Sequence, residues 1–151
     1  MSKTMSLRLS DEQLATVEQI KRRYHQPSIS STLQLLLGEK IREIAHPHIV
    51  FREAAGRVAF VEGTGLSVWE IMMVGRNYDF DSKRTAKHLQ IHDWLVEVAF
   101  TYAREYPDEV NARLAENDAM DFESLKRMLP QARETVVPDD YDPLVGVESA
   151  S

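Results

Sequence analysis

Apolar and polar residues alternate at the start of the chain. The apolar positions are Met5, Leu7 and Leu9, and the polar positions between them are Thr4, Ser6 and Arg8. Because successive side chains of a strand point to opposite faces, this pattern predicts one strand with an apolar face. No second strand follows nearby, so both edges of this strand would lack a partner. We therefore expect it to pair with the same strand of a second copy.

A helix is predicted directly after this strand. Ser10 to Gln13 read Ser-Asp-Glu-Gln, which matches a capping box with serine at the N-cap and glutamine three residues later. Leu14, Val17 and Ile20 come next at helical spacing. The pattern ends near Tyr24, and Gln26-Pro27-Ser28 separates this helix from the next segment.

A second, more apolar helix is predicted from Ser28 or Ser30 to Ile44. Its expected buried positions are Ile29, Leu33, Leu36, Leu37, Ile41 and Ile44. This set is too large for so short a segment to cover by itself, so another chain is expected to cover part of it.

Residues 1–45, a strand and two helices, resemble the ribbon-helix-helix (Arc/MetJ class) family. The resemblance implies an intertwined homodimer whose two strands form an antiparallel ribbon in the major groove of DNA. It assigns base contacts to Thr4, Ser6 and Arg8, and phosphate contacts to the start of the second helix. Arginine can donate two hydrogen bonds to guanine, and serine or threonine can bond either base type. An exposed polar face of a strand is the alternative.

Phosphate contacts are expected at four positions. Ser28, Ser30 and Ser31 stand where free amides and the helix dipole favour an anion, and Lys3 adds a charge. Serines at a helix start also serve as plain caps, so that alternative stays open.

Residues 46–116 are predicted to form a hairpin followed by helices. Ala45 to His48 contains Pro47 and is expected to be a linker. Two short apolar runs around Glu53-Ala54-Ala55-Gly56 indicate a hairpin, and Glu62 to Gly65 indicates a turn. The helices expected after that turn are Val68–Gly75, 81–88, 92–105 and 108–115. This order is helix-turn-helix-like, with a β arm.

The run from Val61 to Glu70, Val-Glu-Gly-Thr-Gly-Leu-Ser-Val-Trp-Glu, resembles a family of small helix-turn-helix domains. The family's Gly-Thr-Arg-Ile-x-Val-Trp-like turn and Ala-x-x-Tyr-Ala pattern match residues 63–69 and Ala99 to Ala103. Many members resemble antitoxins encoded beside PIN-like ribonuclease toxins, so the resemblance over residues 48–114 implies an antitoxin. Gly65 stands where the family has arginine and Val58 where it has proline, which weakens the case for DNA contact by this turn.

Three further features of this region have two interpretations each. Lys83, Arg84 and Lys87 form a basic face, either a secondary DNA contact or a solvated surface. The Gly63-Thr64-Gly65 turn lacks the length and lysine of a phosphate-binding loop, so we expect a tight turn. Trp69 and Trp94 lie in apolar helical stripes and are expected in the core instead of stacking on bases.

Charge is distributed unevenly along the chain. The net charge is −6, but residues 1–46 carry seven Lys/Arg against five Asp/Glu, whereas residues 117–151 carry three against eight. The local charge determines where DNA can bind. The acidic tail, residues 117–151, is apolar only at scattered points and is expected to bind a partner protein. Its expected toxin contacts are Lys126, Arg127, Arg133 and Tyr141, since a cation can enter a nuclease's carboxylate cluster.

Several classes of protein are disfavoured. The chain has no cysteine, so it has neither disulfides nor thiolate chemistry. No run of residues reads as a membrane span or a signal peptide, and a cytoplasmic location is expected. His88 and His92 have a metal-compatible spacing, but a helix break is expected near Gln90. We therefore expect no metal, no cofactor and no enzymatic activity.

The predicted fold is mainly α with short β: a ribbon-helix-helix, a hairpin with a helix-turn-helix-like domain, and an extended acidic tail. The predicted function is a homodimeric, sequence-specific DNA-binding antitoxin and transcriptional autorepressor. One alternative is a regulator or DNA-organising protein without a toxin. Another is a dimeric interaction scaffold that does not bind DNA. The assembly of dimers into higher oligomers on DNA stays open.

Overall fold

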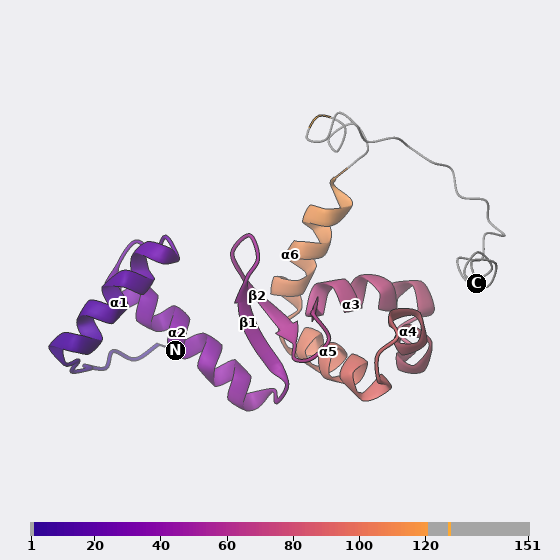
Figure 1. Cartoon of the computed structure of the whole chain (residues 1–151), viewed down its shortest axis with the longest axis horizontal. Coiled ribbons are helices and arrows are strands. Elements are labelled where there is room, and N and C mark those ends of the chain that lie inside the picture. Colours follow the sequence, from indigo (N-terminus) through magenta and orange to yellow (C-terminus); the bar gives the residue numbers. More distant parts are fainter. Residues whose placement is uncertain (1, 121–126, 128–151) are drawn as a thin grey trace, which may run out of the picture. The chain divides into compact units, whose positions relative to one another are not determined.

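A computed structural model describes residues 2–120 and 127 of the 151-residue chain. The described part is mainly helical and contains one small antiparallel sheet, which confirms the predicted mainly α class (Figure 1). By its internal contacts the chain divides into two units, Met1–Ala112 and Arg113–Ser151. None of the described helices is long and apolar enough to cross a bilayer.

The first two helices, α1 (Asp11–Arg23) and α2 (Ile29–Ala45), pack against each other. Ser10 caps α1, and its hydroxyl accepts from the Gln13 amide while the Gln13 side chain accepts from the Ser10 amide, as predicted. Ser28 caps α2, so the earlier of the two predicted starts is correct. Both helices therefore begin where the local sequence offers a side-chain acceptor to free amides.

Residues 2–9 form neither helix nor strand in the single chain, so the predicted strand is not confirmed. A strand needs a neighbour for its backbone hydrogen bonds, and this copy offers none to these residues. The ribbon stays a prediction about the dimer.

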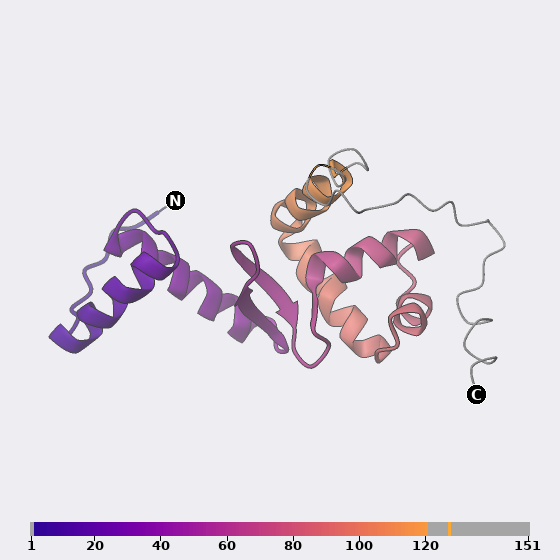
Figure 2. The same cartoon turned by 45° about the horizontal axis from the view of Figure 1, so that its top comes forward.

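A three-stranded antiparallel sheet comes next, in the order β1-β2-β3. Its hairpin is visible between the first helices and the later ones in Figure 2. The predicted hairpin is β1 (Ile49–Glu53) paired with β2 (Arg57–Val61), in the register Phe51 to Ala59. A two-residue strand, β3 (Leu66–Ser67), pairs with β2 and was not predicted. It is too short to show an alternating pattern.

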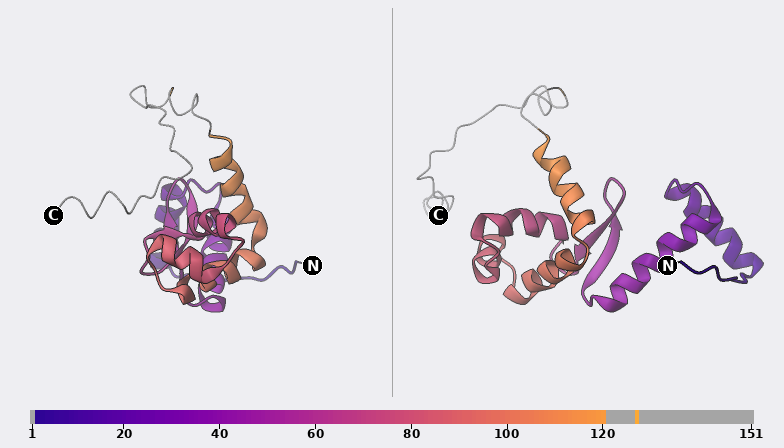
Figure 3. Two further views of the ribbon diagram at one scale, coloured as in Figure 1. Left: turned by 90° about the vertical axis from the view of Figure 1, so that its right-hand side faces the viewer. Right: turned by 180° about the vertical axis from the view of Figure 1, so that it is seen from behind.

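The helices after the sheet match the predicted order. They are α3 (Val68–Gly75), the 3-10 turn η1 (Arg76–Tyr78), α4 (Ser82–Leu89), α5 (Asp93–Glu105) and α6 (Pro107–Asp118). The helices α3, α4 and α5 pack against one another (Figure 3). Gln90 ends α4 in a left-handed conformation, so the predicted break between His88 and His92 is confirmed.

Almost all of the hydrophobic core lies after residue 45. Ile71, Val96, Ala99 and Tyr102 are fully buried there. Among the described residues up to 45, only Val17 is a buried hydrophobic residue. The helix pair α1–α2 therefore has almost no core within this single copy.

Trp94 does not lie in the core, and that prediction is wrong. Its side chain is 48% exposed and packs edge-on against His48, with 5.0 Å between the ring centroids. Trp69 is half-buried. Residue 94 lies in the first turn of α5, where the fully buried face is formed by Val96 and Ala99 instead.

Candidate nucleic-acid interface

The N-terminal segment exposes both of its predicted faces. Thr4, Ser6 and Arg8, the predicted base contacts, are exposed, and so is Lys3. The apolar positions are open too, because Met5 is 89% and Leu7 64% exposed. Leu9 is only partly covered and lines a shallow groove of about 320 Å³ on α1, beside Gln13 and Val17. In this copy the apolar half of the segment has little to bury against.

The helix α2 has a second uncovered apolar stripe. Leu37, Ile41 and Ile44, predicted to be buried, are 56%, 62% and 70% exposed. They lie four and three residues apart, so they share one face of α2. The chain's own residues leave this face open, and its predicted cover by another chain stays a prediction.

The opposite face of α2 is occupied by the chain itself. Glu39 forms an ion pair with Arg57 of β2, with 2.6 Å between Oε1 and Nε, and Arg57 also lies over the Tyr24 ring. Arg42 pairs with Glu109 and lies 4.4 Å from the Tyr106 ring centroid. Hence α2 turns its charged face to the sheet and the later helices and its apolar face to solvent.

Burial and pairing change the proton affinities in this cluster. Desolvation and the Glu109 carboxylate raise the pKa of the Tyr102 hydroxyl well above its usual range, although the nearby Arg42 acts in the opposite direction. The Tyr102 hydroxyl donates to Glu109 and accepts from Arg42. A hydrogen bond from Arg57 to Glu39 raises the pKa of that guanidinium. These charged groups pair with one another, and Glu39, Arg42, Arg57 and Glu109 line a pocket of about 330 Å³.

In the junction between α2 and the sheet, Ala45, Pro47 and His48 are exposed, but His46 is buried. His46 caps the end of α2 and is buried between the rings of Tyr102 and Tyr106. Its Nε2 lies 2.8 Å from Oε2 of Glu105, although the two groups are not aligned as a hydrogen bond. The sequence pattern did not predict this role, because a histidine beside a proline carries no signal of tertiary burial.

The serines at the start of α2 are used partly for capping. The Ser28 hydroxyl accepts from the Ser31 amide at 3.0 Å, and the Ser31 hydroxyl donates to the Ser28 carbonyl at 2.9 Å. Ser30 is exposed, and its hydroxyl has no hydrogen-bond partner among the described residues. Ser30 is therefore the best placed of the three to contact phosphate, together with the free amides of the first turn.

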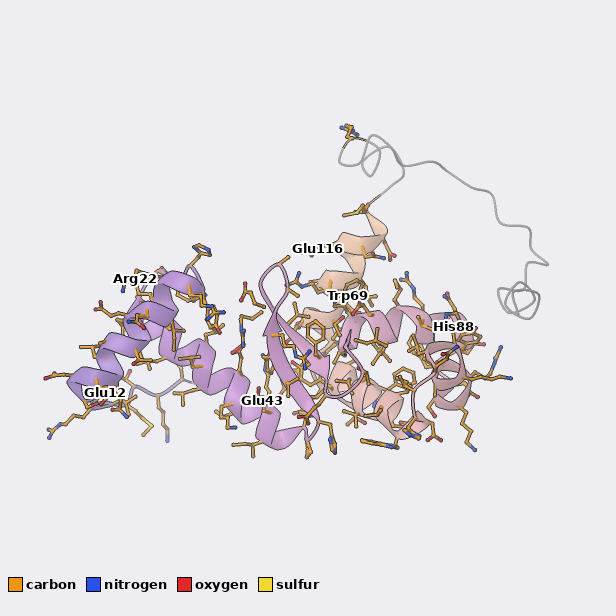
Figure 4. The ribbon with its side chains drawn as sticks, viewed as in Figure 1. Glu12, Arg22, Glu43, Trp69, His88 and Glu116 are labelled. Carbon is orange, nitrogen blue, oxygen red and sulfur yellow. The ribbon has the colours of Figure 1, made fainter. Side chains whose placement is uncertain are left out.

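A basic cluster at the end of α1 was not predicted. Lys21, Arg22 and Arg23 occupy the last turn, and Arg22 is labelled in Figure 4. None of the three pairs with a carboxylate in the described part of the chain. Three consecutive basic residues could have indicated this cluster from the sequence. However, basic residues also stabilise a helix C-terminus through its dipole, so the run has a second explanation.

A second set of exposed cations lies on α4. Lys83, Arg84 and Lys87 are all exposed on this helix, as predicted for a basic face. The turn between β2 and β3 is tight, as predicted: Gly63 and Gly65 have φ of +82° and +70°, and the Thr64 hydroxyl donates to the Val61 carbonyl.

Most of the predicted partner contacts in the tail cannot be placed. Lys126, Arg133 and Tyr141 lie outside the described residues, and Arg127 is exposed. No group of three or more His, Asp or Glu side chains among residues 2–120 and 127 is arranged to hold a metal ion.

Comparisons with known proteins give no match. Neither a family model, nor a curated protein, nor a solved structure matches this chain.

Proposed function

We propose that the chain is a homodimeric, sequence-specific DNA-binding regulator, with its first 45 residues forming both the dimer and the DNA-reading surface. The observation that carries this proposal is the open apolar surface of these residues. Met5 and Leu7 are exposed on the N-terminal segment, and Leu37, Ile41 and Ile44 are exposed on α2. Exposed apolar area gathered on one element marks an interaction site.

A second copy is the partner that fits this surface best. The N-terminal segment has alternating residues and no strand partner, and an identical segment supplies the same alternation in antiparallel pairing. The charged face of α2 is already occupied by Arg57 and Glu109, so only the apolar face is open to a partner. Self-association of identical patches produces a closed two-fold dimer.

Pairing of the two segments leaves their polar face for DNA. With Met5 and Leu7 turned toward the helices, Thr4, Ser6 and Arg8 point away from the dimer core. A two-stranded ribbon fits the major groove, where arginine can donate two hydrogen bonds to guanine. Lys3 and the start of α2 at Ser30 would contact phosphates.

Dimerisation is tested by Ile41→Glu. A charge at the centre of a buried apolar face cannot be solvated, so the variant should be monomeric where the unchanged protein is dimeric. Sedimentation velocity measures this directly. Gln19→Glu is the matched control, because it adds the same charge at an exposed position of α1. A monomeric unchanged protein, or a dimeric Ile41→Glu variant, would contradict the proposed dimer.

DNA reading is tested on the DNA upstream of the chain's own gene. Arg8→Ala should cost roughly 1–3 kcal/mol of specific binding if Arg8 contacts a guanine. Lys3→Ala should weaken specific and unrelated DNA about equally. Fluorescence anisotropy with both duplexes separates the two effects. If the unchanged protein binds neither duplex, a dimeric interaction scaffold is the better account.

An antitoxin role is part of the proposal and rests on the resemblance of residues 48–114. In that role the chain would repress its own gene and neutralise a toxin, a PIN-like ribonuclease in the resembling family, through residues 117–151. Co-expression with the product of an adjacent gene, followed by purification of the pair, tests this role. A regulator without a toxin is the outcome if no such product binds.

A further inference from the structure

The cations of this protein divide into paired and unpaired sets. Arg42, Arg57 and Lys40 lie within ion-pair distance of carboxylates. Lys83, Arg84 and Lys87 of α4 form no ion pair with any described residue, and α4 itself contains no acidic residue. We call these three residues the α4 basic face. Its charge is not neutralised within the described protein.

The fold holds this face outward. Thr85 and Ala86 are buried on the inner side of α4. The Lys83 and Lys87 positions are four residues apart, about 6 Å along the helix axis. Three cations are therefore presented together on one turn of a helix whose inner side is fixed by packing.

Tyr78 supports the same surface from η1. The Arg84 guanidinium carbon lies 4.9 Å from the Tyr78 ring centroid, and the Tyr78 hydroxyl lies 2.8 Å from Nδ1 of His88. His88 is labelled on α4 in Figure 4. Because Arg84 covers the tyrosine ring, the ring does not offer a platform for stacking an unpaired base.

The start of α4 does not serve as the anion site. Asp81 caps the helix, and its carboxylate accepts from the Arg84 amide at 2.9 Å. That negative charge opposes a phosphate at the helix terminus. Any contact with an anion must therefore come from the side chains of Lys83, Arg84 and Lys87. These side chains can bind a row of phosphates better than one buried anion.

The next helix is poorly suited to enter a DNA groove. The α5 helix carries Asp93, Glu97 and Glu105 on exposed positions, and these repel phosphate. Base reading by α5, the role a second helix would have in a helix-turn-helix, is thus disfavoured. Of the helices α4 and α5, α4 is therefore the one whose cations can contact DNA.

We infer that the α4 basic face binds the phosphate backbone of double-stranded DNA without reading its sequence. This inference rests on the proposed function and adds a second contact beside the ribbon. Exposed cations whose one adjoining tyrosine ring, Tyr78, is covered by Arg84 favour duplex backbone over single strands. The ribbon supplies specificity, and α4 supplies affinity that falls with salt.

The test compares two full-length variants that carry the same reduction in charge. One is Lys83→Ala/Arg84→Ala/Lys87→Ala, and alanine preserves the helix. The control is Arg52→Ala/Arg76→Ala/Arg104→Ala, which removes three exposed cations outside α4 and outside the proposed dimer face. Binding to the upstream DNA and to an unrelated duplex of equal length is measured over a series of KCl concentrations, with a duplex RNA of equal length measured alongside. Circular dichroism checks both folds.

The α4 variant should bind both duplexes at least about tenfold more weakly at low salt. The slope of log affinity against log salt should flatten by roughly 0.9 for each phosphate that the variant no longer neutralises. The ratio between the two duplexes should stay unchanged, whereas Arg8→Ala should lower that ratio. The control should retain most of the slope.

Three results would overturn the inference. Unchanged affinity and slope in the α4 variant would show that the proposed DNA function stands without this contact. An equal reduction in the control would show a general charge effect. Weaker binding to duplex RNA alone, with DNA binding retained, would assign the face to RNA. No DNA binding by the unchanged protein would instead reject the proposed function itself.

Discussion

Tyr102 is a fully buried side chain that links distant parts of the sequence. Its hydroxyl donates to Glu109, seven residues later, and accepts from Arg42, sixty residues earlier. The ring also packs edge-on against His46. One side chain thus connects α2, α5 and α6 through a polar network that is largely covered from solvent.

Tyr102→Phe tests this network through pH. The folded protein holds the hydroxyl proton more tightly than the unfolded chain, because burial raises the pKa. The resulting stability is complete below about pH 10, the ordinary pKa of tyrosine, and is lost as pH rises above it. The unchanged protein should therefore lose stability at alkaline pH more steeply than the phenylalanine variant. Urea unfolding at pH 7 and at about pH 10.5, just above that ordinary pKa, measures the difference.

At neutral pH the same variant should lose about 1 kcal/mol, because Arg42 and Glu109 keep each other as partners. Parallel losses of stability with pH in both proteins would mean that Tyr102 is not the responsible group.

For single residues, the sequence predicts the features that depend on residues nearby in the chain. The Ser10 and Ser28 caps depend on residues within three positions; the Ser10 cap was predicted, and Ser28 was one of two predicted starts. The exposure of Trp94 depends on which residues surround α5 in the folded chain, and the helical stripe alone misplaced it. The pairing of Arg42 with Glu109 spans 67 residues and leaves no local pattern.

The element that combines two roles is α2. Its bounds and cap were predictable, because period and capping are local properties. The exposure of its apolar residues in one copy fits the expectation that another chain covers part of them, and their burial in a dimer stays a prediction. The charged face, with Glu39 and Arg42, faces the sheet and the later helices instead.

Gly38→Ala should stabilise this helix. Glycine inside a helix costs roughly 0.5–1 kcal/mol relative to alanine, and an added Cβ at this position meets nothing within 4 Å. Thermal unfolding should show the gain as a higher midpoint, with the dimer retained in sedimentation. Loss of the dimer would instead place Gly38 at a close approach between two copies.

The whole molecule contains two unequal cores. The larger one lies among the sheet and α3 to α5, and the smaller one between α1 and α2 has Val17 as its one buried hydrophobic residue among those described. The order of elements and the mainly helical class were predictable from alternating and helical patterns. The formation of the ribbon was not testable in one copy, since pairing between chains needs both of them.

Thermal stability should therefore depend on protein concentration. Covering the apolar surface of residues 2–45 links folding of this part to association, so a hundredfold increase in concentration should raise the unfolding midpoint by several degrees. Differential scanning calorimetry over that range measures the shift. The Ile41→Glu variant should show none. A midpoint that is independent of concentration in the unchanged protein would contradict a dimer that stabilises the fold.

The continuity of α2 has a consequence for the geometry of any complex. One uninterrupted helix from Ile29 to Ala45 carries both the proposed dimer face and the face that forms ion pairs. The angle between these two faces around the helix axis is therefore fixed. Inserting one residue after Lys40 would rotate everything beyond it by about 100° and move it by about 1.5 Å. The length and twist of α2 therefore fix how the residues at its two ends are placed. In the proposed dimer on DNA, the pitch of this helix would therefore set how far apart along the duplex the two halves can bind.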